Sequence, residues 1–90
     1  MSTTHILVKG RVQGVGFRFY AMRLAESLAL TGFVKNLPAG GVEIEVEGET
    51  DTINSFITKL QKGDLGRNIA DIDVEWIPYQ KKYESFDVRF

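Results

Sequence analysis

The residues best suited to chemistry lie in the segment 10–18 (GRVQGVGFR). Glycines follow Gln13, and glycine accepts the backbone dihedrals that turn successive N–H groups toward one point. Arg18 adds a permanent positive charge and a planar fork of donors. Since a helix is expected to begin directly after the glycines, the positive end of its dipole faces the same point. The segment is predicted to bind an anion, and a phosphate fits it best.

The segment 10–18 alone is also compatible with two simpler structures. It lacks the Gly-Lys-Ser/Thr ending of a P-loop, and the chain contains no GxGxxG. A tight strand-to-helix turn with a solvated Arg18, or an Arg18 that neutralises a carboxylate on the helix surface, would use the same residues. Asn36 offers a second polar group in the segment 31–38 (TGFVKNLP). Asparagine also favours turns, so Asn36 could be a turn residue alone.

The residues that are missing near the glycines restrict the reaction. No His, Cys, Asp or Glu lies close by to act as nucleophile or general acid: Glu26 falls on the polar side of the expected helix, and His5 is expected at the surface, near a frayed strand start. A phosphate monoester expels an alkoxide, which generally needs an acid or a metal. An acyl phosphate expels a carboxylate, whose conjugate acid has a pKa of about 4. A site that only positions groups and stabilises charge therefore suits an acyl phosphate.

The elements that must position these groups follow from hydrophobic periodicity. Strands are expected at 4–9, 32–37, 42–47, 72–76 and 86–90, and helices at 19–29 and from Thr50 or Asp51, as N-cap, to a stop at Gly63. The apolar arc of the first helix comprises Ala21, Met22, Leu24, Ala25, Leu28 and Ala29. The second helix carries Ile53, Phe56, Ile57 and Leu60 at helical spacing, and the aromatics expected in the core are Phe56, Trp76, Phe86 and Phe90.

The order of elements predicts an α+β fold of the ferredoxin-like type. The expected order is strand, helix, strand, strand, helix, strand. Chains of this order form an antiparallel sheet with both helices on one face, and here a short extra strand follows at the C-terminus. Ninety residues, 43% of them hydrophobic, suffice for one core, so residues 1–90 are expected to form one domain. The fold alone does not determine a function.

Four motifs together resemble the acylphosphatase family: 10–18, 30–38 (LTGFVKNLP), 42–48 (VEIEVEG) and 86–90 (FDVRF). The likeness covers essentially the whole chain and is strongest from Val8 to Leu37. It implies the same fold and a hydrolase that converts a small acyl phosphate to a carboxylate and inorganic phosphate, with no cofactor and no metal. Ala29 departs from the family pattern, in which many members have glycine.

The resemblance also assigns roles to residues. Arg18 and Asn36 are implied to be catalytic, with Asn36 holding the attacking water opposite the leaving carboxylate. The phosphoryl oxygens are implied to lie on Arg18 and on backbone N–H groups, namely those of Gln13, Gly14, Val15, Gly16, Phe17 and Arg18.

Rival functions on the same fold are less consistent with the sequence. RNA-recognition modules stack bases on the sheet face opposite the helices. Here that face is expected to present six carboxylates, those of Glu43, Glu45, Glu47, Asp71, Asp73 and Glu75, which would repel nucleic acid. A metal carrier would need cysteines, and the chain has none. The remaining alternative is a non-catalytic domain that senses an anion or another ligand.

Charge and composition predict the partners and the compartment. Residues 1–36 carry five basic and one acidic side chain, whereas residues 37–90 carry six basic and eleven acidic ones. The basic part surrounds the glycine segment and is expected to attract a small anion, so inorganic phosphate or sulfate should compete with the substrate. A polar N-terminus and short apolar runs predict a cytoplasmic protein without a membrane partner, and we expect a monomer.

Overall fold

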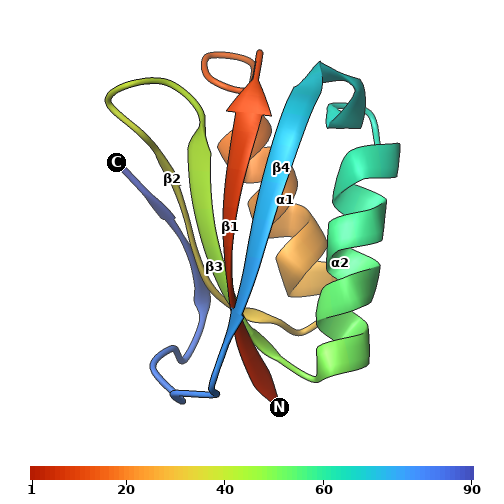
Figure 1. Ribbon diagram of the computed structural model, residues 1–90, viewed down its shortest axis with the longest axis vertical. Coiled ribbons are helices and arrows are strands. Elements are labelled where there is room, and N and C mark those ends of the chain that lie inside the picture. The colour runs from red at the N-terminus through yellow and green to blue at the C-terminus, as the bar shows by residue number, and fades with distance from the viewer.

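The computed structural model describes residues 1–90 and confirms the predicted order of elements. The strands are β1 (Ser2–Gly10), β2 (Thr31–Asn36), β3 (Val42–Gly48), β4 (Ile69–Ile77) and β5 (Phe86–Arg89), and the helices are α1 (Phe17–Ser27) and α2 (Thr50–Lys62), with a 3-10 turn at Gly66–Asn68. Both helices lie on one face of the sheet (Figure 1). Neither helix is long and apolar enough to cross a membrane.

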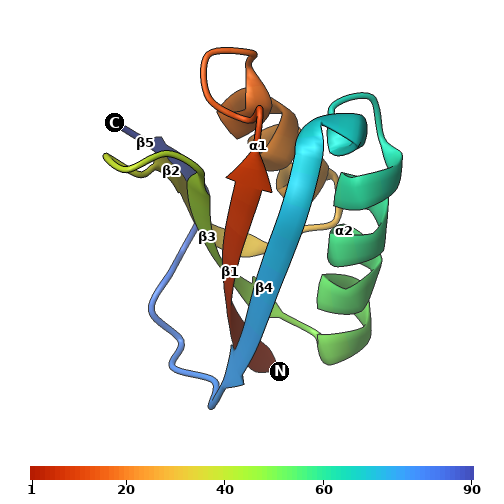
Figure 2. The same cartoon turned by 45° about the horizontal axis from the view of Figure 1, so that its top comes forward.

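The five strands form one sheet in the order β4-β1-β3-β2-β5. The first four pair antiparallel, as predicted, but β5 runs parallel to β2, with Val34 opposite Val88, so the sheet is mixed. The reason is the connection 78–85, which crosses from the β4 edge to the β2 edge at the lower end of the sheet in Figures 1 and 2. The glycine loop lies at the opposite, upper end, between β1 and α1.

The core lies between the sheet and the helices. In the central strands, register places Ile6 of β1 and Val34 of β2 on either side of Ile44 of β3, all fully buried. The helices contribute Phe17, Ala21, Ala25, Ile53, Phe56 and Leu60. Burial of each large apolar side chain stabilises the fold by about 1.5–3 kcal/mol. The alternation predicted for β3 is confirmed on this face.

Three of the four helix ends differ from their predicted positions, whereas the stop predicted at Gly63 is confirmed. Helix α1 begins at Phe17 and ends at Ser27, and Ala29 is exposed in a left-handed conformation (φ 57) rather than on the apolar arc. Helix α2 has Glu49 as its N-cap residue, without a side-chain cap. Thr50 instead forms a hydrogen bond with the hydroxyl of Ser2, so neither Thr50 nor Asp51 caps the helix.

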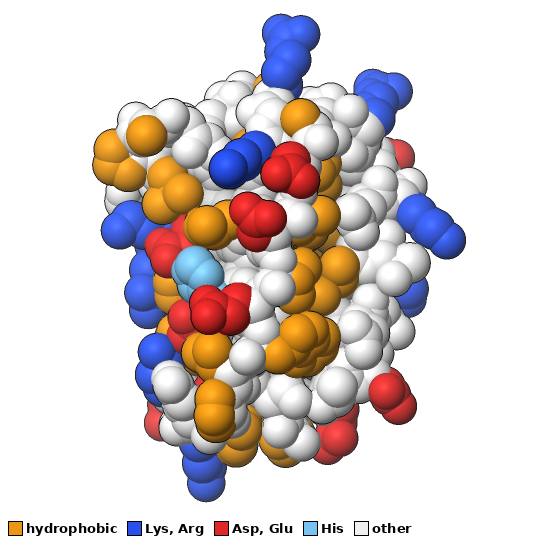
Figure 3. All heavy atoms as spheres, viewed as in Figure 1, with side chains coloured by type: hydrophobic (Ala, Val, Ile, Leu, Met, Phe, Trp, Pro, Cys, Tyr) orange, Lys and Arg blue, Asp and Glu red, His pale blue; other side chains and the backbone are white.

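Two of the four aromatics predicted in the core are outside it. Phe56 and Phe86 are buried, but Trp76 is 43% exposed and Phe90 is 90% exposed. Strand β4 is an edge strand, and α2 covers its inner side only in part, which leaves a hydrophobic strip open to solvent between them (Figure 3). Phe90 lies beyond the last strand.

The outer face of the sheet is also different from the prediction. Glu45 and Glu47 are only 8% and 2% exposed, because the connection 78–85 lies over them and donates hydrogen bonds to them. Of the six carboxylates, Glu43, Asp71, Asp73 and Glu75 stay accessible, and Figure 3 shows acidic side chains around the histidine. His5 is within β1, not at a frayed start, and its Nε2 lies 2.7 Å from Glu43 Oε2.

Candidate active site

The loop between β1 and α1 takes its shape from two glycines. Gly14 and Gly16 have φ values of 76 and 81, and Gly16 is the N-cap residue of α1. A Cβ atom at either position would meet nothing within 4 Å, so the dihedral angle rather than crowding demands glycine. Other residues would lose about 1–2 kcal/mol in this conformation.

The N–H groups of residues 13–19 donate no hydrogen bond to an acceptor within the protein. The first intrahelical bond of α1 runs from the Tyr20 N–H to the Gly16 carbonyl, over 3.0 Å. Helix N-termini always leave several N–H groups free, and a side chain commonly caps one of them. Here no side chain does so, and the free donors continue back into the loop. This end of the molecule is therefore a concentrated source of donors and of positive potential.

A small cavity joins the loop to the predicted side chains. Its volume is about 170 Å³, and it is lined by Val12, Gly14, Gly16, Phe17, Arg18, Phe19 and Asn36. The structure thus brings Arg18 and Asn36 together, although they come from different elements. The side chains of Gln13 and Val15 are outside the lining. Val12 and Phe19 were not predicted as lining residues, and only their proximity to the motif could have indicated them.

Arg18 is held by the end of β5. Its Nη1 donates a hydrogen bond of 2.9 Å to the Arg89 carbonyl, and its Cζ lies 4.5 Å from the centre of the Phe90 ring. Arg18 forms no ion pair, so it does not neutralise a carboxylate on the helix, and its two contacts with the β5 end distinguish it from a freely solvated side chain. A guanidinium has five N–H donors, and this contact uses one. The others remain free for an anion.

Asn36 is the last residue of β2, paired with Val42 of β3, and is therefore not a turn residue. Its Oδ1 is buried and has no hydrogen-bond partner. A buried unpaired oxygen costs about 1–3 kcal/mol and is uncommon in native proteins. At the wall of the cavity, this oxygen is suited to accept a hydrogen bond from a bound molecule.

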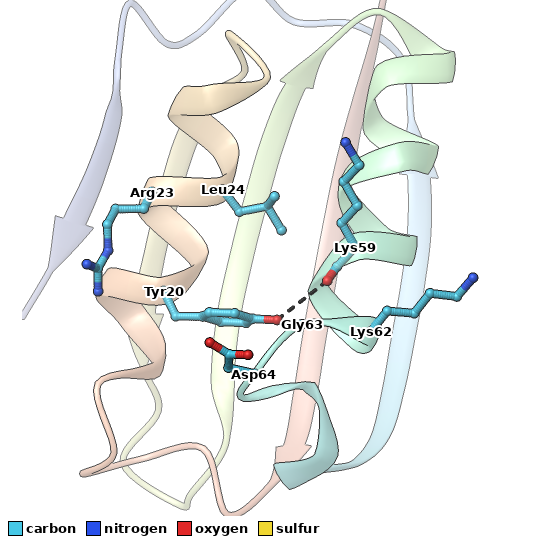
Figure 4. Close-up of a pocket in the computed structure, with 7 residues that line it drawn as sticks. All are labelled: Tyr20, Arg23, Leu24, Lys59, Lys62, Gly63 and Asp64. Carbon is cyan, nitrogen blue, oxygen red and sulfur yellow. Dashed lines mark hydrogen bonds between the residues drawn. The ribbon is translucent and has the colours of Figure 1, made fainter.

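A larger hollow, of about 640 Å³, lies between the two helices (Figure 4). Its lining includes three cations, yet Figure 4 shows the side chains of Arg23 and Lys62 pointing away from it. Tyr20 spans the gap and donates a hydrogen bond of 2.7 Å to the Leu60 carbonyl. Burial, and then the charge of Asp64, raise the pKa of Tyr20, so its hydroxyl stays a donor. This hollow has volume without convergent donors, and we assign the site to the smaller cavity.

Comparison with known proteins agrees with this assignment. Residues 4–88 match the profile of the family described as acylphosphatase. An acylphosphatase of Clostridium beijerinckii is 40% identical over 84 residues, 93% of each chain, and one of Archaeoglobus fulgidus is 38% identical over 100% of each. The crystal structure of the Bacillus subtilis acylphosphatase superposes with a TM-score of 0.93 at 34% identity, over 100% of each chain. This chain belongs to the acylphosphatase family.

Proposed function

We propose that this chain hydrolyses the carboxyl-phosphate bond of small acyl phosphates and releases a carboxylate and inorganic phosphate. Membership of the family supports the proposal. The observation that carries it is the cavity in which free N–H donors, Arg18 and the unpaired Oδ1 of Asn36 meet. The N–H groups and Arg18 have donors without acceptors, which a phosphoryl group would supply. The Oδ1 of Asn36 is an acceptor without a donor, which a water molecule would supply.

In this proposal the loop and Arg18 hold the phosphoryl group. The N–H groups of residues 13–18 and the guanidinium donate to its nonbridging oxygens. Charge is spread over these oxygens in the transition state of phosphoryl transfer. Donors that are already oriented stabilise that charge without reorganisation. Catalysis then rests on positioning and electrostatics.

Asn36 supplies the alignment of the nucleophile. Its Oδ1 accepts a hydrogen bond from a water molecule, whose oxygen attacks phosphorus in line with the leaving group. The P–O bond to the acyl group breaks, and the carboxylate leaves with the electron pair. The proton of the water passes to a phosphoryl oxygen. The carboxylate needs no general acid, because its conjugate acid has a pKa of about 4.

The size of the cavity suits a phosphoryl group and a water molecule. A water molecule in the liquid occupies about 30 Å³, and the cavity measures about 170 Å³. The site would therefore recognise the phosphoryl end, and inorganic phosphate or sulfate would compete for it. Three properties stay predictions from the sequence: that the protein is a monomer, that it is cytoplasmic, and that residues 1–90 form one domain.

The test compares two substrates at equal concentration. Benzoyl phosphate should be hydrolysed rapidly and 4-nitrophenyl phosphate barely, because nitrophenolate is a poorer leaving group than a carboxylate. A chelator should leave the rate unchanged, since no three His, Cys, Asp or Glu side chains are grouped as metal ligands. Similar rates on both substrates would indicate a general phosphatase. Phosphate binding without turnover of either substrate would indicate a sensing domain instead.

A further inference from the structure

The side chain of Gln13 connects the glycine loop to the turn after β2. Its amide nitrogen lies 2.8 Å from the Leu37 carbonyl oxygen and 2.7 Å from the Gly41 carbonyl oxygen. A primary amide has two N–H donors, so each carbonyl receives one. These are the only side-chain hydrogen bonds that residues 13–17 form with the rest of the chain. Val12 and Phe17 anchor the two ends of the loop in the core, and between them Gln13 makes its polar link to the turn after β2.

The turn that Gln13 contacts is itself fixed. The Leu37 N–H donates to the Gly41 carbonyl over 3.0 Å, and the Gly40 N–H donates to the Leu37 carbonyl over 3.1 Å. Gly41 has a φ of 84, and a Cβ atom there would lie 2.8 Å from the Val8 carbonyl oxygen of β1. The turn is therefore packed against the backbone of a central strand. The hydrogen bonds of Gln13 connect the loop to this packed turn.

The two carbonyls flank the strand pair that carries Asn36. Leu37 follows Asn36 directly, and Gly41 precedes Val42, the residue opposite Asn36 in β3. Gln13 consequently links the free N–H groups of the loop to the backbone on both sides of this pair. We propose that Gln13 is a positioning residue that sets the distance between the phosphate-binding loop and the Asn36 amide. The inference rests on the proposed hydrolysis of acyl phosphates.

The loss of this link should affect turnover more than phosphate binding. The N–H donors and Arg18 belong to one continuous segment, so they can still surround a phosphate without Gln13. The water on Asn36 would no longer be in line with the phosphorus atom. Because a misplacement of about 1 Å can cost about 10²-fold in rate, we expect Gln13→Ala to lower kcat about 10- to 100-fold and to change the inhibition constant of inorganic phosphate less than about threefold.

A second variant tests the hydrogen bonds themselves. Gln13→Glu keeps the shape, but an ionised carboxylate only accepts hydrogen bonds and would face two carbonyl oxygens. Its protonated form regains one O–H donor. Neither residues 14–17 nor the turn 37–41 carries a titratable side chain. We therefore expect the kcat of Gln13→Glu, relative to the parent, to rise as the pH falls from 7 to about 4.5, near the ordinary pKa of glutamate. Gln13→Ala should show no such rise.

Gln61 offers a matched control, because it is an exposed glutamine of α2 whose side chain forms no hydrogen bond. Gln61→Ala and Gln61→Glu should keep the parental kcat at every pH. The proposal is overturned if Gln13→Ala keeps the parental kcat, if kcat and phosphate affinity fall in the same proportion, or if the relative kcat of Gln13→Glu does not change with pH. A parent that hydrolyses no acyl phosphate would refute the proposed function as well, whereas an active parent with unaffected Gln13 variants would refute this inference alone.

Discussion

The two ends of the sheet treat polar groups in opposite ways. At the upper end in Figure 1, the N–H groups of residues 13–19 have no acceptor in the protein. At the lower end, the Glu47 carboxylate is almost fully buried and accepts hydrogen bonds from four donors. Its partners are the Thr3 hydroxyl and the backbone N–H groups of Gln80, Lys82 and Tyr83.

Hydrogen bonds decide the charge state of this lower cluster. Burial alone would raise the pKa of Glu47, but the bonds from Thr3 and the 78–85 backbone outweigh burial and hold its pKa below the usual range. Glu45 follows the same pattern: burial opposes ionisation, and bonds from Tyr83 and Lys82 lower its pKa. Both carboxylates thus fasten the connection that carries β5 to the far edge of the sheet.

The polar groups at the upper end serve function, whereas those at the lower end serve stability. A buried polar group that has all its partners strengthens the fold, whereas one without partners weakens it and persists where it serves a ligand. The same chain keeps donors free beside Arg18 and Asn36 and directs four donors to Glu47. Substitutions of Arg18 and Asn36 should therefore change activity with little effect on stability, and those of Glu47 should do the reverse.

The largest effect is expected from Arg18→Ala. Loss of the guanidinium should lower kcat/KM by about 10³-fold or more, the scale known for arginines that stabilise phosphoryl transfer, and should abolish competition by phosphate and sulfate. Arg18→Lys should restore little, because an ammonium lacks the planar fork. Steady-state kinetics with added phosphate measures both effects. If Arg18→Ala binds phosphate as well as the parent does, the anion is bound elsewhere.

Asn36→Ala should separate binding from chemistry. The variant should keep its fold and its affinity for phosphate, while kcat falls about 10²-fold because the water is no longer aligned. Asn36→Asp should be no better, since its charge repels the phosphoryl group. The lining of the cavity includes no His, Cys, Asp or Glu, so the parental kcat should be nearly flat from about pH 5 to 8. A bell-shaped profile, or an Asn36→Ala variant with parental kcat, would assign the water to another residue.

Glu47→Gln should affect stability instead. An amide places N–H donors against the donors that the carboxylate accepts, so we expect a loss of about 2–3 kcal/mol in the free energy of unfolding. Glu43→Gln is the control and should lose less than about 1 kcal/mol, because its pair with His5 is partly exposed. Urea unfolding at pH 7 measures both, and an equal loss in the two variants would contradict the comparison.

Glu47→Gln should also change how the free energy of unfolding depends on pH. The folded-state pKa values of Glu45 and Glu47 are lowered, so their contribution to stability is complete above the unfolded value of about 4.3 and is lost as the pH falls through the folded values. The parent should therefore lose stability below about pH 4, and Glu47→Gln should lose less over the same range.

The smallest effect is expected at Ala29, in the turn between α1 and β2. Ala29 has a φ of 57, which costs a residue with a Cβ atom about 1–2 kcal/mol, partly offset by the greater chain entropy of glycine in the unfolded state. Ala29→Gly should raise the free energy of unfolding by about 0.5–1 kcal/mol. Its kcat should stay parental. Destabilisation would show that the Ala29 side chain has a packing role.

Features formed by neighbouring residues in the sequence could be predicted, whereas features formed by residues far apart in the sequence could not. The glycine segment and Arg18 are contiguous, so their geometry followed from a local turn and a helix start. Asn36 needed the family resemblance, because periodicity alone did not distinguish a strand end from a turn. Alternation in β3 identified two faces but not what covers them, which is why Glu45 and Glu47 were wrongly expected in solvent.

Contacts between distant segments were not predictable in this way. Arg18 and Arg89 are 71 residues apart, and no local pattern indicates that the β5 end holds the guanidinium. The edge position of β4 likewise depends on strand order, so Trp76 looked like a core residue. Gln13 was assigned a role for its N–H group, while its side-chain bonds became visible only with the turn in place.

The most direct measurement of the contrast between the two ends is an amide NMR titration with inorganic phosphate. We expect the backbone N–H resonances of residues 13–19 to shift and to exchange more slowly with solvent as phosphate is added. Those of Gln80, Lys82 and Tyr83, already bonded to Glu47, should stay unchanged. Shifts that spare residues 13–19, or that gather around Tyr20, Lys59 and Asp64 between the helices, would contradict the assignment of the phosphate site.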